Sequence, residues 1–74
     1  MLANKTLLQR KYARVINLYA ARYGVTIREA MDLFYKSLTY AEMREGISDM
    51  HCRSDEYLAE ELFIETKDKK LDAF

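Results

Sequence analysis

The residues best suited to metal binding or nucleophilic chemistry are the adjacent His51 and Cys52, the single histidine and single cysteine of the chain. A zinc site needs three or four ligands at suitable spacing, and a Cys-His nucleophile needs two converging side chains, which sequence neighbours seldom provide. We therefore expect neither kind of site. We interpret the segment SDMHCRS as a turn between helices, in which His51 hydrogen bonds inward.

Carboxylates are numerous, but their positions do not indicate acid–base catalysis. Glu56, Glu60 and Glu61 fall on one predicted helix beside solvent, where acidic side chains usually serve solubility. Paired-acid catalysis would also need a pocket, for which 74 residues leave little room. We expect a non-catalytic protein without catalytic residues, cofactor or metal.

Length and composition limit the protein class. The chain of 74 residues predicts one helical domain over 1–74, near the size at which an oligomer often adds needed stability. One cysteine excludes an internal disulfide and fits a reducing compartment. There is no apolar stretch of the ~20 residues that span a bilayer, and the N-terminus lacks the apolar region of a signal peptide. We expect a cytoplasmic protein that does not enter a membrane.

The charges are unevenly distributed although the formal net charge is zero. Residues 1–28 contain six basic and no acidic residues, whereas the remaining 46 residues contain twelve acidic and six basic ones. Zero net charge argues against general affinity for nucleic acid. The asymmetry predicts either a charged partner or two oppositely charged helices that dock on each other.

Helix signals run through the whole sequence, which contains no proline and two glycines. Gly24 and Gly46 are each followed by an aliphatic residue, as expected where a left-handed glycine ends a helix. Three N-terminal signals follow: a capping box of Thr26 with Glu29, a similar pair of Thr39 with Glu42, and Ser54 before two acids. We predict an all-α fold, a compact bundle of three to four helices at about 4–23, 27–37, 40–45 and 55–66, with a frayed tail from about residue 67.

The apolar positions repeat with helical period and predict the core. The first helix has a stripe of Leu8, Tyr12, Val15, Ile16, Tyr19 and Tyr23. The second has a stripe of Ile27, Ala30, Met31, Phe34 and Leu38, opposite a charge ladder of Arg28, Asp32 and Lys36. The last helix is expected to bury Leu58, Ala59, Leu62 and Phe63.

The stretch YGVTIREAMDLF, residues 23–34, has the outline of a helix-turn-helix. A DNA-reading second helix needs donors and phosphate contacts on its exposed face, where this one presents Arg28, Glu29, Asp32 and Lys36. Two of these four would be repelled by phosphate. We favour a structural corner, and a DNA-binding regulator that uses this corner is the alternative.

A second surface signal lies on the first helix. Leu7 and Leu18 are about three turns apart on the side opposite the core stripe, among three basic residues. Such a strip predicts a docking site for an acidic-rimmed protein or for a second copy, unless the acidic C-terminal helix covers it. The candidate partner-binding residues are Leu7, Lys11, Arg14, Leu18 and Arg22.

The segments TIREAMDLF and ISDMHCRSDEYLAEEL make the chain, from about Tyr12 to Glu65, resemble a small bacterial helical family of unknown function. Members of that family are often encoded beside ADP-ribosyltransferase-like toxin genes. The resemblance implies a small protein-binding module, an antitoxin or another regulatory partner of a toxin-like enzyme. The residues that match the shared pattern are Ala30, Phe34, Asp49, His51 and Tyr57. We interpret all five as fold residues.

Overall fold

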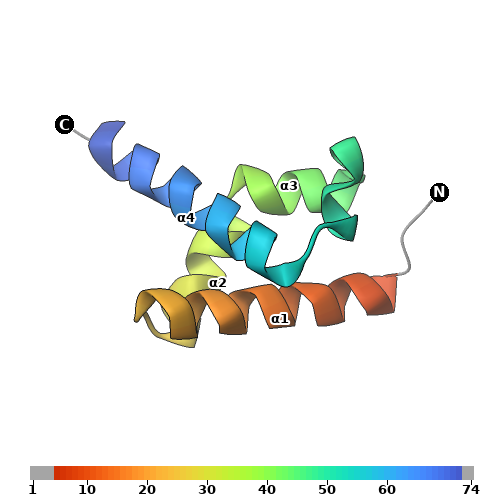
Figure 1. The fold of residues 1–74 in the computed structure, drawn as a ribbon, viewed down its shortest axis with the longest axis horizontal. Helices are drawn as coiled ribbons and strands as arrows, with labels where there is room; N and C mark the ends of the chain where they lie inside the picture. Colours follow the sequence, from red (N-terminus) through yellow and green to blue (C-terminus); the bar gives the residue numbers. More distant parts are fainter. Residues whose placement is uncertain (1–4, 73–74) are drawn as a thin grey trace.

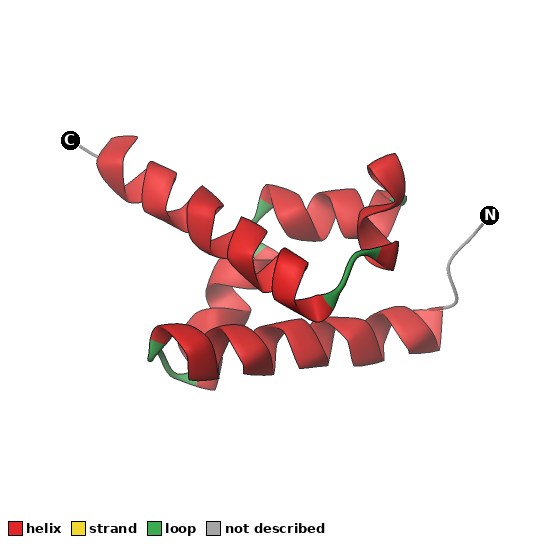
Figure 2. Ribbon diagram, viewed as in Figure 1, coloured by secondary structure: helices red, strands yellow, loops and turns green. Residues whose placement is uncertain are grey.

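Helices account for all the regular structure in residues 5–72, the part of the chain that the computed structural model describes (Figure 2). The elements are α1 (Lys5–Tyr23), α2 (Ile27–Tyr35), α3 (Leu38–Glu45), the short 3-10 helix η1 (Ile47–Cys52) and α4 (Asp55–Asp72). Helix α4 runs diagonally above α1, with α2 and α3 behind them (Figure 1). The predicted all-α bundle is confirmed, with η1 in addition to four α-helices.

Local sequence signals explain the corner between α1 and α2. Gly24 has a φ of +67°, the left-handed conformation that favours glycine, and the Val25 N–H donates to the Ala20 carbonyl at 3.2 Å. The Thr26 hydroxyl then accepts from the Glu29 N–H at 3.1 Å and donates to the Glu29 carboxylate at 3.2 Å. The predicted helix end and capping interaction are therefore confirmed.

The start of α3 differs from the prediction. The helix begins at Leu38 rather than at about residue 40, because Ser37 and not Thr39 is its N-cap. The Ser37 hydroxyl accepts from the Tyr40 N–H at 3.0 Å and donates to the Phe34 carbonyl at 2.5 Å. A hydroxyl that bonds both helices fixes the tight passage from α2 to α3.

A carboxylate from α4 completes this cap. Glu65 accepts hydrogen bonds from the N–H groups of Leu38 and Thr39, the first two residues of α3, and from the Thr39 hydroxyl. The backbone bond from Thr39 is 3.2 Å long and the hydroxyl bond is 3.0 Å. Ser37 and Glu65 together satisfy three N–H groups that no carbonyl within the helix can reach. Thr39 is thus bonded to another helix instead of starting its own.

The last helix begins as predicted and continues further. The Ser54 hydroxyl accepts from the Tyr57 N–H at 3.1 Å, so Ser54 caps α4. The helix extends to Asp72 rather than ending near Thr66, and its C-terminal turns project beyond the other helices (Figure 1). Residues 73 and 74 of the predicted tail lie outside the described residues.

The core lies where α1, α2 and α4 meet and is extended by α3 and η1. Of the predicted core residues, Tyr12, Val15, Ile16 and Tyr19 in α1 and Leu58, Ala59 and Leu62 in α4 are buried. In α2, Ala30 and Phe34 are buried, and Met43 and Met50 add to the cluster from α3 and η1.

Four residues predicted as core are exposed instead: Ile27, Met31, Leu38 and Phe63. In α2 the apolar residues cover a wider arc of the helix than α1, α3 and α4 can occupy, so one part of that arc faces outward. No helix in the described part of the chain is long and apolar enough to cross a membrane.

Candidate docking surface

The predicted strip on α1 is partly used within the molecule. Lys11 Nζ lies 2.7 Å from Asp55 Oδ1, and Arg14 Nε lies 3.0 Å from Asp55 Oδ2, which places the first turn of α4 on the basic side of α1. The charge asymmetry predicted either a charged partner or two oppositely charged helices that dock on each other. The contacts of Lys11 and Arg14 with Asp55 are of the second kind.

The other members of the strip do not share one environment. Leu18 is partly buried and packs against the core, so its expected position away from the core is wrong. It lies seven residues, two turns, after Lys11, which places it on the side of α1 that faces α4. Leu7 is exposed, and the Arg22 guanidinium lies 5.5 Å from the centre of the Tyr23 ring.

The α1–α4 ion pairs lower the pKa of Asp55. Partial burial by itself would raise that pKa, but hydrogen bonds from Lys11 and Arg14, together with their positive charges, outweigh the burial. Asp55 is also the first residue of α4, where a negative charge suits the helix dipole. The carboxylate is therefore a structural contact between α1 and α4.

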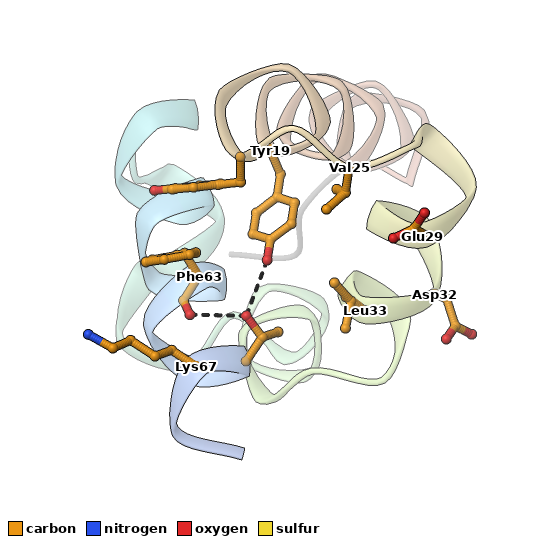
Figure 3. Close-up of a pocket in the computed structure, with 9 residues that line it drawn as sticks. Tyr19, Val25, Glu29, Asp32, Leu33, Phe63 and Lys67 are labelled. Atoms are coloured by element: carbon orange, nitrogen blue, oxygen red, sulfur yellow. Dashed lines mark hydrogen bonds between the residues drawn. The ribbon is translucent and has the colours of Figure 1, made fainter. Parts of the chain in front are cut away.

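A groove of about 540 Å³ opens between the end of α1, one side of α2 and the middle of α4 (Figure 3). Its apolar walls come from all three parts of the chain. Tyr19 and Tyr23 lie on α1, Val25 follows Gly24, Leu33 lies on α2, and Phe63 lies on α4. Because these residues are far apart in sequence, the groove exists only when the helices are packed.

Aromatic stacking and two hydroxyl groups shape the groove on its α4 side. The rings of Tyr23 and Phe63 are stacked, with centroids 4.2 Å apart and planes at 4°. Thr66 donates to the Phe63 carbonyl at 3.0 Å, and its oxygen lies 3.2 Å from the Tyr19 hydroxyl, which therefore donates to it (Figure 3). The buried Tyr19 ring is thus held in place at the base of the groove.

The rim of the groove is charged. Glu29 and Asp32 stand on the α2 side, and Lys67 stands on the α4 side (Figure 3). Asp32 pairs with Lys36 at 3.1 Å, and both side chains are exposed, so a competing charge can replace this pair at little energetic cost. The arrangement combines an apolar interior with two carboxylates on one edge, which suits an apolar side chain accompanied by a cation.

The groove is not evident from the sequence, because apolar periodicity does not reveal how far a side chain is covered. Phe63 lies on the apolar stripe of α4, which predicts burial, but the crossing of α4 over α1 leaves its ring 37% exposed. Tyr23 is likewise on the α1 stripe and is only partly buried. Periodicity identifies which residues share a side of a helix, but it does not say how far a neighbouring helix covers that side.

The turn around His51 differs from the expectation in one contact. His51 Nδ1 is buried without a hydrogen-bond partner in the described structure, so the expected inward hydrogen bond of His51 is not formed by this nitrogen. The ring instead lies beside Gly46, where a Cβ would be 3.6 Å from its Cε1 atom. Cys52 is exposed. The described side chains, those of residues 6–67, contain no group of three or more His, Cys, Asp or Glu residues arranged to hold a metal ion.

The α1–α2 corner presents mixed charges. Arg28 is exposed on α2, but Asp32 forms an ion pair with Lys36, the residue after the helix, and Glu29 is engaged in the cap. Comparison of the sequence with protein-family models, and of the chain with curated proteins and solved structures, gives no match.

Proposed function

We propose that this protein is a small non-catalytic module that binds another protein through the groove formed by α1, α2 and α4. The observation that carries the proposal is the exposed Phe63 ring stacked on Tyr23 at the edge of an apolar depression. Fixed aromatic side chains around a concave apolar surface are frequent centres of binding energy in protein interfaces. The preferred occupant is a bulky apolar side chain of the partner.

The rim supports a more specific partner chemistry. Glu29 and Asp32 stand at the α2 edge of the groove, so a lysine or arginine beside the inserted apolar side chain would meet two carboxylates. Lys67, the basic residue that lines the groove, stands on the opposite, α4 side, and the basic side chains of Lys11 and Arg14 contact Asp55. We therefore place the docking site at the groove rather than on the α1 strip.

The resemblance to the toxin-associated bacterial family supports a class of partner. In this proposal the protein is an antitoxin or regulatory subunit, and its partner is a toxin-like enzyme encoded beside it in the native host. A basic and apolar segment of that enzyme would occupy the groove.

The central test is the affinity of the purified protein for the product of the neighbouring gene, measured by calorimetry. Phe63→Ala removes one wall of the groove, and we expect it to weaken binding at least about tenfold, equivalent to ~1.4 kcal/mol. Ile64→Ala is the matched control, because Ile64 is the next residue of α4 and a comparably exposed apolar side chain outside the groove lining. Equal affinities of the two variants would contradict the proposed site.

A second pair of variants tests the charged rim. Glu29→Gln keeps the capping geometry and removes the charge, whereas Glu60→Gln removes an exposed charge from α4 away from the groove. We expect Glu29→Gln alone to slow association and to reduce its dependence on salt. An unchanged salt dependence would mean that the partner presents no cation to this rim.

A further inference from the structure

The outward side of α2 carries a second apolar surface, distinct from the groove. Ile27, Met31 and Tyr35 follow one another at four-residue spacing and are 55%, 44% and 41% exposed. Advancing by ~100° per residue, they span about 80° of the helix, beside the arc of Ala30 and Phe34 that enters the core. We call Ile27, Met31 and Tyr35 the α2 ridge.

One end of the α2 ridge is supported by aromatic contacts. Tyr35 contacts Phe34 at a ring-centroid distance of 5.3 Å and Tyr40 at 4.9 Å, both edge to face. Met31 lies between Ala30 and Asp32 in the middle of the helix. The Tyr35 ring is therefore fixed before association, which lowers the cost of packing this end of the ridge against another helix.

We propose that the α2 ridge is the contact surface of a homodimer, in which the α2 helices of two copies pack antiparallel about a two-fold axis at Met31. A ridge at four-residue spacing packs into the grooves beside an identical ridge, which is the commonest class of helix contact. A second copy supplies that ridge, because a two-fold axis places the same surface on both sides of an interface.

The charges beside the ridge match this arrangement. Arg28 and Asp32 lie on the same flank of α2, three residues before and one residue after Met31. In an antiparallel pair centred on Met31, the same flanks of both helices adjoin, and Arg28 of one copy lies within about two residues, ~3 Å along the axis, of Asp32 of the other. Among the side chains that the structure describes, those of residues 6–67, no ion pair involves Arg28, and Asp32 has an exposed pair with Lys36 that a closer charge can replace. The dimer would thus form two symmetric Arg28–Asp32 pairs.

The size of the ridge predicts the strength of association. A standard stable interface buries ~800 Å² on each partner, more than three partly exposed side chains provide. We therefore expect a weak dimer with a dissociation constant on the order of 100 µM, whose rim charges contribute mainly to register. None of the three ridge residues lines the groove, and the proposed dimer shares with it only Asp32, which stands on the groove rim.

The test is sedimentation equilibrium of the purified chain from about 10 µM to about 1 mM, with no other protein present. We expect dimerisation in the wild type and at least a tenfold weaker dimer for Met31→Glu, which places two carboxylates at the axis. Ile64→Glu, a change to a similarly exposed apolar residue on α4, should leave association unchanged. A wild type that stays monomeric at about 1 mM, or a dimer unaffected by Met31→Glu, would overturn the proposal.

A charge exchange tests the antiparallel register and does not depend on Met31→Glu folding normally. Arg28→Asp and Asp32→Arg should each weaken the dimer several-fold, because each places like charges opposite one another twice. The double variant Arg28→Asp/Asp32→Arg should restore most of the wild-type affinity. Failure of the double variant to recover would overturn the proposed arrangement. The groove proposal is tested with a different protein and different variants, so either can fail alone.

Discussion

Two carboxylates among the described side chains of helix α4, Asp55 and Glu65, contact other helices, and the two contacts are built differently. At the first residue of α4, the negatively charged Asp55 forms ion pairs with two positively charged side chains of α1, Lys11 and Arg14. Ten residues later, Glu65 meets backbone N–H groups and a hydroxyl at the start of α3. Asp55 is matched by formal charges, whereas Glu65 is matched by the exposed donors of a helix end.

The difference determines how much each contact contributes to stability. Water can solvate Lys11 and Arg14 when Asp55 is absent. Forming the ion pairs therefore adds little net stabilisation to the folded state. The N–H groups that Glu65 binds are fixed in direction by α3 and have no carbonyl partner within the helix. Hydrogen bonds to a charged acceptor contribute more than partly exposed ion pairs, so we expect Glu65 to be the more important of the two carboxylates.

The largest expected effect is that of Glu65→Ala, which removes the acceptor for two backbone donors and the Thr39 hydroxyl. We expect a loss of about 2 kcal/mol in the free energy of unfolding, measured by urea denaturation. Glu60→Ala, at an exposed position of the same helix, should change it by less than about 0.5 kcal/mol. Similar losses in the two variants would mean that the remote cap does not hold α3.

An intermediate effect is expected for Leu18→Glu, which tests whether the α1–α4 contact near Asp55 depends on packing as well as on charge. Leu18 packs against the core, so the substitution should lower the free energy of unfolding by about 1–2 kcal/mol. The exposed neighbour Asn17→Glu provides the control. If both variants melt like the wild type, Leu18 is not part of the contact and returns as a candidate docking residue.

The smallest expected effect is that of Asp55→Asn, because the ion pairs are near the surface. At neutral pH we expect a loss of at most about 1 kcal/mol. The pKa of Asp55 is lowered in the folded protein, so this stabilisation is fully present above its ordinary pKa of ~3.9 and is lost as the pH falls through the lowered value. The stability difference between wild type and Asp55→Asn should therefore disappear at strongly acidic pH. A difference that persists there would have a cause other than the carboxylate charge.

Much of the fold was predictable because its signals are local. Gly24, the Thr26–Glu29 cap and the Ser54 cap each act within a few residues, so the sequence is sufficient to identify them. The docking of a basic first helix on an acidic last helix was one of two interpretations of the charge distribution. Choosing between them required the observed contacts of Lys11 and Arg14.

The candidate surfaces were harder to predict because they depend on how far one helix covers another. Periodicity placed Phe63, Ile27 and Met31 on apolar stripes, but the crossing of the helices left all three exposed. The role of Thr39 was likewise decided by Glu65, a residue 26 positions later. A sequence signal that acts within a few residues cannot identify a contact between residues this far apart in the chain.

The sequence by itself therefore determined the four main helices with approximate bounds, their glycine ends at Gly24 and Gly46, where φ is +67° and +69°, and most of the core stripes, since these follow from backbone conformation and side-chain period. The tertiary structure alone decided which parts of the stripes remain open as the groove and the α2 ridge, and which carboxylate caps α3. Helix identity is a property of neighbouring residues, whereas exposure depends on the angles at which helices cross.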